Sequence, residues 1–199
     1  VIRLFIIGFA LYLMNRRVDD RNILEKFAQD FCDVIDKYCK YIVVSGFVAI
    51  SSGRTRGTED IDIITERLNI NKFDLLHKDL KRNSFLCMQG SNSKNLYKDY
   101  LKENTSIRYT YKDFLLPEIE LKFAKDELDY SQVKNRVKLN MTGLDVWFSS
   151  INSNIAFKEE LLKSDKDIED AKHLRIVYSD EIDENEINKI KKMIRVLRL

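Results

Sequence analysis

The stretch Asp60-Ile-Asp-Ile-Ile constrains the fold of this chain most, because acidic and aliphatic residues alternate in it with a period of two. That period places Asp60 and Asp62 on one face of a β-strand, with Ile61 and Ile63 on the other. One face of such a strand is suited to burial, and the other keeps its carboxylates available. We therefore expect a strand with one functional edge here.

Hydrophobic periodicity predicts the other elements. Helices are expected at 20–39, 47–52, 71–81, 154–163, 165–178 and 184–196, and strands at 41–44, 107–115, 118–124, 133–140 and 144–150. This order predicts an α/β (α+β) fold in which a small mixed sheet is flanked by helices and followed by a C-terminal helical tail. We divide the chain into an N-terminal stretch (1–13), a core (14–150) and a helical region packed on that core (151–199).

Composition excludes some classes of protein and leaves others open. With 44% hydrophobic and 33% charged residues, the chain is neither a disordered nor a membrane protein. A net charge of +2 neither requires nor excludes a nucleic-acid partner. Three scattered cysteines indicate reduced thiols in a cytoplasmic protein, and two histidines weigh against a zinc site.

The N-terminal residues Val1 to Leu13 are apolar apart from Arg3. They are fewer than the roughly 20 residues that a membrane-spanning helix needs, and the charge pattern is not that of a signal peptide. We expect the protein to start at Met14, with residues 1–13 as upstream sequence. A short hydrophobic anchor or an additional packed element are the alternatives.

The paired aspartates indicate the chemistry of a metal site. Residues at i and i+2 of a strand lie about 7 Å apart on one face, a suitable distance for gripping one or two divalent cations. Carboxylate oxygens with open positions favour Mg²⁺ (or Mn²⁺), which takes further ligands from water and substrate phosphates. The turn Ser45-Gly46, between a strand and a helix, offers backbone N–H groups to a phosphate, and Arg54 and Arg56 add cationic donors.

This segment resembles the nucleotidyltransferase superfamily of the DNA polymerase β type, and within it the minimal, antitoxin-like and AbiEii-like branch. Those proteins carry a strand, Gly-Gly or Gly-Ser, a short helix and then Gly-x-x-Arg-x-Thr-x-Asp-hydrophobic-Asp. The chain matches this pattern at Gly53, Arg56, Thr58, Asp60, Ile61 and Asp62. It departs at Ser45, where such proteins often have the first glycine.

A second match lies in the helical region. Lys158, followed by Lys166-Asp-Ile-Glu-Asp170, is similar to the lysine and Lys/Arg-Asp-x-x-Asp helical motif that follows the core in this branch. The resemblance thus extends over about residues 40–178. It also implies a third carboxylate on a neighbouring strand, for which we choose Glu120, with Glu118 and Asp145 as alternatives.

The resemblance implies a nucleotidyltransferase-type sheet and Mg²⁺-dependent transfer of NMP from an NTP to a protein, RNA or small-molecule hydroxyl, in a toxin–antitoxin or defence system with a cognate toxin. Asp60, Asp62 and Glu120 would bind metal and be catalytic. Ser45, Gly46, Arg56, Thr58 and Lys158 would bind the nucleotide. For Arg56 the alternative is an ion pair with Asp60 or Asp62, and for Thr58 it is a hydroxyl that holds the loop. A catalytically degenerate fold that binds a nucleotide or a partner is the competing function.

Overall fold

The computed structural model describes residues 23–199, so the predictions for residues 1–13 lie outside the described part of the chain. Its strands are β1 (Tyr41–Val44), β2 (Asp60–Thr65), β3 (Phe85–Cys87), β4 (Ile107–Tyr111) and β5 (Glu118–Phe123). Its helices are α2 (Gly46–Ser51), α3 (Ile70–Arg82), α4 (Ser93–Asp99), α5 (Glu127–Lys134), α6 (Ile151–Phe157), α7 (Asp165–Val177) and α8 (Glu184–Arg198). Residues 23–35 form a further helix, and Lys158–Leu162 continue α6 as a π-helical turn.

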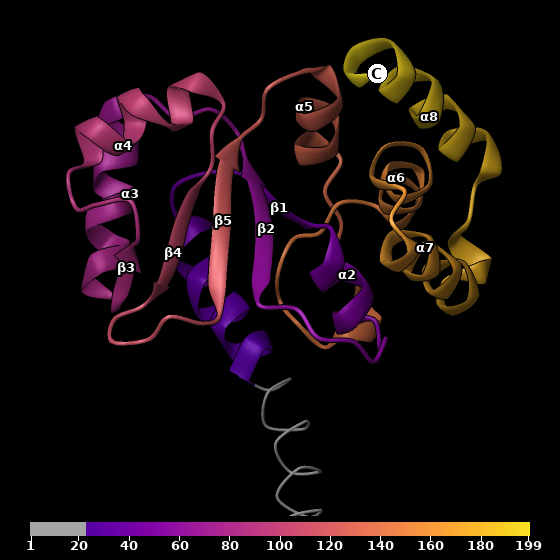
Figure 1. Cartoon of the computed structure of the whole chain (residues 1–199), viewed down its shortest axis with the longest axis horizontal. Helices are drawn as coiled ribbons and strands as arrows, with labels where there is room; N and C mark the ends of the chain where they lie inside the picture. The colour runs from indigo at the N-terminus through magenta and orange to yellow at the C-terminus, as the bar shows by residue number, and fades with distance from the viewer. Residues whose placement is uncertain (1–22) are drawn as a thin grey trace, which may run out of the picture.

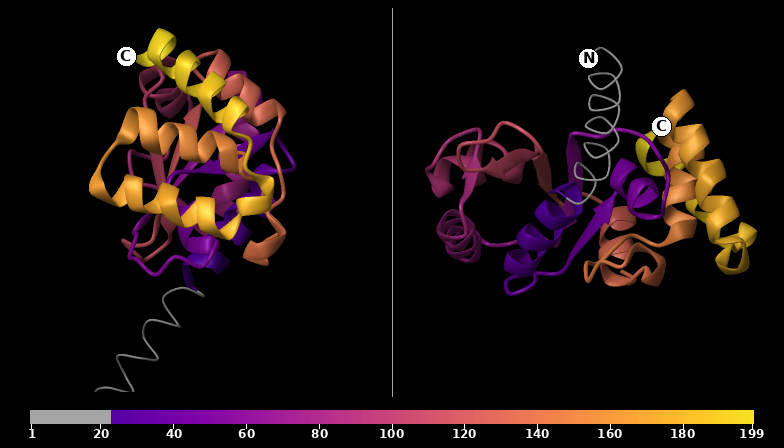
Figure 2. Two further views of the ribbon diagram at one scale, coloured as in Figure 1. Left: turned by 90° about the vertical axis from the view of Figure 1, so that its right-hand side faces the viewer. Right: turned by 90° about the horizontal axis from the view of Figure 1, so that it is seen from below.

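The five strands form one mixed sheet in the order β1-β2-β5-β4-β3. β2 and β5 run parallel at its centre, and the other neighbouring pairs are antiparallel. In Figure 1 the sheet stands in the middle, with α3 and α4 at one end and α5 to α8 at the other. The two views of Figure 2 show the same C-terminal group of helices on one side of the sheet. The predicted fold class, a small mixed sheet with flanking helices and a helical tail, is therefore confirmed.

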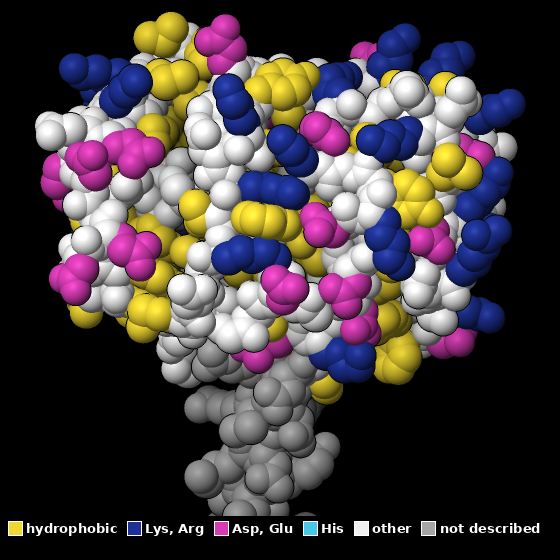
Figure 3. Space-filling model, turned by 180° about the vertical axis from the view of Figure 1, so that it is seen from behind, with side chains coloured by type: hydrophobic (Ala, Val, Ile, Leu, Met, Phe, Trp, Pro, Cys, Tyr) yellow, Lys and Arg dark blue, Asp and Glu magenta, His cyan; other side chains and the backbone are white. Residues whose placement is uncertain are grey.

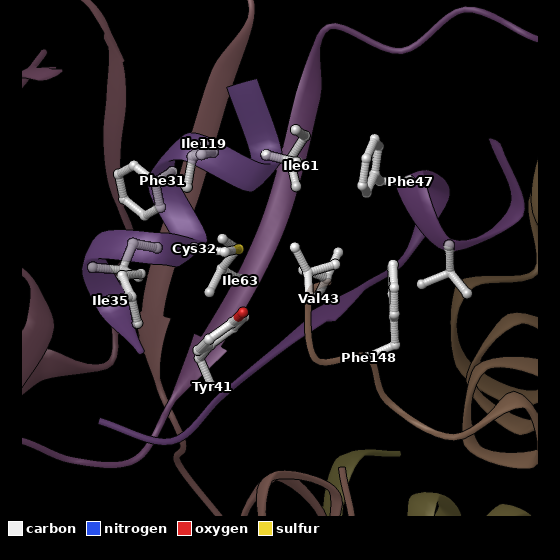
Figure 4. Packing of buried hydrophobic residues seen from close by; sticks show 14 of the residues in the cluster. Phe31, Cys32, Ile35, Tyr41, Val43, Phe47, Ile61, Ile63, Ile119 and Phe148 are labelled. Atoms are coloured by element: carbon white, nitrogen blue, oxygen red, sulfur yellow. The ribbon is translucent and has the colours of Figure 1, made fainter. Parts of the chain in front are cut away.

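The two faces of the central strands differ as the alternating pattern predicts. Ile61, Ile63, Ile119 and Leu121 are fully buried on one face. Helix 23–35 covers this face, and Figure 4 shows its side chains Phe31, Cys32 and Ile35 directed at the sheet. The aliphatic side chains of the neighbouring strands β2 and β5 thus pack with this helix in a single core. The opposite face of the two strands is left to the charged residues.

Two of the predicted strands are wrong. Residues 133–140 begin inside helix α5, which Asp126 caps by accepting a hydrogen bond from the backbone N–H of Asp129 at 3.1 Å. From 144 to 150 the chain makes only isolated bridges, Val43 with Phe148 and Val137 with Phe148. The cap and the acidic first turn begin helix α5 at Glu127, so that the first two residues of the predicted strand, Val133 and Lys134, are helical.

Two smaller differences concern β3 and β4. β4 ends at Tyr111, so residues 112–115 of the predicted strand form a loop, and the short strand β3 was not predicted. Within residues 23–199, every helix is too short or too polar to traverse a bilayer. The three cysteines are buried and form no disulfide in this part of the chain.

Candidate functional site

Parallel pairing of β2 and β5 brings four carboxylates together. Asp60 pairs with Glu118 and Asp62 with Glu120, and directly paired residues project from the same face of a sheet. These side chains are exposed or half-buried, whereas the residues between them are buried. The three residues predicted as catalytic therefore share one face of two adjacent strands.

Asp60 is held in place by Thr58. The Thr58 hydroxyl lies 2.8 Å from Oδ1 of Asp60 and 3.2 Å from its carbonyl oxygen. The loop before β2 therefore fixes the direction of the first carboxylate. The contact agrees with the alternative given for Thr58, a hydroxyl that holds the loop. It also places Thr58 beside the candidate site.

Asp62 carries an incompletely compensated charge. Burial raises the pKa of its carboxyl above the ordinary value of 3.8, and the nearby carboxylates of Glu120 and Asp60 add to the rise. The ammonium of Lys122 and a hydrogen bond from Ser45 act in the opposite direction on the same pKa. A cation bound between these carboxylates would relieve their mutual repulsion.

Ser45 takes a backbone conformation suited to glycine. Its φ is 67° and its ψ is −136°, in the region that side chains with a Cβ avoid. Serine at this point, where the resembling proteins often have glycine, therefore strains the turn. The Ser45 hydroxyl also donates a hydrogen bond to Asp62. Residues with a strained backbone of this kind concentrate at functional sites.

Arg56 binds neither of the aspartates expected as ion-pair partners. Its guanidinium donates to both carboxylate oxygens of the buried Asp170, at 3.1 and 3.0 Å. The same guanidinium packs against Gly46, where a Cβ atom would lie only 2.2 Å from Nη2 of Arg56. The alternative pairing with Asp60 or Asp62 is thus wrong, and the phosphate-binding role of Arg56 remains a prediction.

Lys158 also meets Asp170. Its side chain is 1% exposed, and Nζ lies 2.8 Å from Asp170 and 3.3 Å from Asp167. Arg54 adds a further cation, with Nε at 2.8 Å from Asp170, although the angle of this contact is not that of a hydrogen bond. We call Arg54, Arg56, Lys158 and Asp170 the Asp170 cluster. It joins α7 and the end of α6 to the loop before β2.

The candidates for the third carboxylate lie in different surroundings. Arg108 on β4 reaches both Glu118 at 3.2 Å and Glu120 at 3.4 Å, so it partly neutralises these two residues. Asp145 does not join the site. It lines a hollow with Cys32 and Tyr41, and its exposed carboxylate pairs with Lys138.

Asp60 and Asp62 suit a magnesium ion that shares its coordination with a substrate. Among residues 23–199, no three His, Cys, Asp or Glu side chains converge closely enough to surround an ion by themselves. Magnesium is usually bound by one or two carboxylates, with phosphate oxygens and waters completing its shell. The donor set of two strand carboxylates, one of them with a raised pKa, fits Mg²⁺ or Mn²⁺ in this manner.

A pocket of about 190 Å³ adjoins Asp62. Ser45, Asp62 and Lys158 line it, and so do Lys122, Asn154 and Arg198, which were not among the predicted site residues. Pockets for whole ligands measure about 300–1,000 Å³, so this one would hold only part of a ligand of that size. The sequence could have predicted that Lys122 lies on the same strand face as the carboxylates, because it continues the alternation Glu118-x-Glu120-x-Lys122. Asn154 and Arg198 lie on helices far along the chain and gave no local signal.

Comparison with solved structures identifies the fold. The structure matches the antibiotic-resistance factor ANT(2'')-Ia over 88% of this chain and 92% of the other, with a TM-score of 0.55 and 12% sequence identity. The fold is of the nucleotidyltransferase type. An antigenic nucleotidyltransferase-like protein from Paracoccidioides brasiliensis matches over 89% of this chain and 88% of its own, at 17% identity and a TM-score of 0.48. The latter is too distant to support an argument.

Comparison by sequence gave no match for this chain, either with a protein-family model or with a curated protein. The likeness to nucleotidyltransferases therefore rests on the fold alone, and both membership of the superfamily and the branch within it remain predictions.

Proposed function

We propose that this protein is a Mg²⁺-dependent nucleotidyltransferase that transfers NMP from an NTP to an acceptor hydroxyl. The observation that carries the proposal is the placement of Asp60 and Asp62 on one face of β2, next to Glu120 and the Ser45-Gly46 turn, within a nucleotidyltransferase fold. Carboxylates, small residues at a turn and a pocket lie close together there, which supports the proposal.

Each residue has a role in this proposal. Asp60 and Asp62 would hold Mg²⁺, which when bound supplies charge neutralisation on the triphosphate. Ser45 and Gly46 contribute a hydroxyl and a backbone N–H to phosphate oxygens, and Lys122 places a cation beside them. Glu120 accepts the proton of the attacking hydroxyl. Thr58 keeps Asp60 in the required direction, so that catalysis depends mainly on positioning.

The competing function is a catalytically degenerate module that binds a nucleotide or a partner protein. One observation favours it: the proposed proton acceptor Glu120 is paired with Arg108. Such a module would show a rise in melting temperature with Mg²⁺ and NTP but no transfer. The acceptor, a cognate toxin and a role in toxin–antitoxin or defence systems remain predictions from the sequence.

The test is incubation of the purified protein with Mg²⁺, a cell extract and each of the four NTPs, radiolabelled at the α-phosphate. The label should enter protein, RNA or a small molecule, and Asp62→Asn should reduce transfer by at least about a hundredfold. Asp145→Asn is the matched control, because Asp145 lies away from the site, and it should retain full activity. Equal transfer by the parent and Asp62→Asn would refute the assignment of the site.

A further inference from the structure

The loop between β4 and β5 exposes three consecutive large apolar side chains. Phe114, Leu115 and Leu116 are 62%, 78% and 48% exposed. Runs of this kind are rare on protein surfaces unless they bind something, because their exposure to water is unfavourable.

The backbone of this loop is fixed. The Thr110 hydroxyl lies 3.2 Å from the carbonyl oxygen of Phe114 and 3.1 Å from that of Pro117. The backbone N–H of Phe114 donates to the carbonyl of Tyr111 at 3.1 Å. The apolar side chains are therefore presented outward by a hydrogen-bonded turn.

The loop forms one wall of a wide groove that reaches the candidate site. The groove has a volume of about 1,190 Å³, and Phe114, Leu116 and Ile23 line it together with Asp60 and Glu118. Asp62 lines the smaller pocket of about 190 Å³. Asp60 thus lines the groove and Asp62 lines the pocket, and the proposed function assigns the pocket to the nucleotide. The wide groove is then left for the acceptor.

The charges of the groove disfavour a nucleic acid. Glu59, Asp60 and Glu118 line it, against two cations, Arg56 and Lys166, and Arg56 is bound to Asp170. A polyphosphate backbone needs a surplus of exposed cations. On the face of the molecule shown in Figure 3, basic and acidic side chains are also interspersed.

We propose that the groove binds the acceptor as a polypeptide segment with apolar and basic side chains, whose Ser, Thr or Tyr hydroxyl lies beside Asp60. Its apolar side chains pack on Phe114 and Leu116, and a Lys or Arg faces Glu59. This inference rests on the proposed function and adds the class of acceptor. In the reaction, the hydroxyl oxygen bonds to the α-phosphorus while the bond from that phosphorus to the bridging oxygen breaks. The proton passes to Glu120, and pyrophosphate leaves.

The experiment uses fluorescein-labelled peptides that contain one Ser or Tyr among Leu and Lys residues. Matched peptides carry Asn in place of Leu, or Glu in place of Lys. Fluorescence anisotropy with the full chain measures binding without any nucleotide. We expect the Leu/Lys peptides to bind, and both substituted sets to bind about tenfold more weakly or worse.

Two variants locate the binding. Phe114→Ser combined with Leu116→Ser should weaken peptide binding about tenfold, since both side chains line the groove. Ile176→Ser combined with Val196→Ser is the control, because these residues are 76% and 82% exposed and line no part of the groove. Circular dichroism melting shows whether either variant is folded.

The outcomes separate the two proposals. Peptide binding by the parent that is lost only in the Phe114/Leu116 variant supports the inference, and transfer of label to the same peptide extends it. Absence of peptide binding by the parent, or equal binding by both variants, overturns it. Transfer only to RNA or to a small hydroxyl compound overturns it as well, while leaving the nucleotidyltransferase proposal intact. If Mg²⁺ and NTP neither raise the melting temperature nor support any transfer, the proposed function itself fails.

Discussion

The molecule contains two clusters of charge that differ in their balance. In the Asp170 cluster, one fully buried carboxylate meets three cations, two of them also tied to Asp167 or Glu169. On β2 and β5, by contrast, carboxylates gather around Asp62, whose pKa is raised. A buried group whose charge is neutralised within the protein holds the fold together. A group of like charges costs stability, and that cost is explained if the group binds a cation.

The largest expected effect follows from unbalancing the first cluster. Asp170→Asn removes the buried carboxylate that Arg54, Arg56 and Lys158 share and leaves Lys158 with Asp167 alone, at 3.3 Å, so the free energy of unfolding should fall by about 3–5 kcal/mol. Glu169→Gln, which removes an exposed partner of Arg54, is the control and should cost less than about 1 kcal/mol. Urea denaturation measures both, and equal losses would show that Asp170 has no special structural role.

A close contact between Gly46 and Arg56 connects the Asp170 cluster to the Ser45-Gly46 turn. Gly46→Ala should destabilise the protein by about 1–3 kcal/mol, because the added methyl group displaces the Arg56 guanidinium from Asp170. In an Arg56→Ala background the same change should be neutral or stabilising, as Ala favours helices over Gly. Additive losses in this double-mutant cycle would contradict the proposed contact.

At the carboxylates on β2 and β5, we expect a substitution to raise stability rather than lower it. Because the pKa of Asp62 is raised in the folded protein, the stability linked to its protonation is present below 3.8 and is lost as the pH rises through the raised pKa. Asp62→Asn cannot ionise and should therefore melt at a higher temperature than the parent at neutral pH without divalent cations. The difference should vanish in acid. Calorimetry over a pH series checks this, and a lower melting temperature for Asp62→Asn at neutral pH would be evidence against an uncompensated carboxylate.

The smallest effect is expected at Arg108. This arginine is half exposed, so Arg108→Gln should change stability by less than about 1 kcal/mol. Removing its charge should strengthen Mn²⁺ binding next to Glu118 and Glu120, which titration with Mn²⁺ would detect. Weaker Mn²⁺ binding by Arg108→Gln would indicate that the arginine supports the metal site.

The strand carboxylates and the Asp170 cluster also differ in how far the sequence predicts them. Asp60, Asp62, Glu118 and Glu120 were placed on strand faces correctly, because side-chain direction in a strand depends only on a local period of two. The partner of Arg56 lies 114 residues away, and no local pattern specifies such a contact.

Residues 133–140 were misassigned for a related reason. Their apolar spacing was read as a strand, while the cap at Asp126 and the burial of Val133 against Ile42 and Ile64 made part of the segment a helix. Tertiary packing overrode the local pattern.

The central claim is that Asp60 and Asp62 share a divalent cation with a bound triphosphate. Crystals grown with Mn²⁺ and a non-hydrolysable NTP analogue test it through the anomalous signal of manganese. We expect a peak about 2.1 Å from carboxylate oxygens of both aspartates and from phosphate oxygens beside Ser45 and Gly46. A nucleotide bound elsewhere, or at this site with its metal away from both aspartates, would contradict the account.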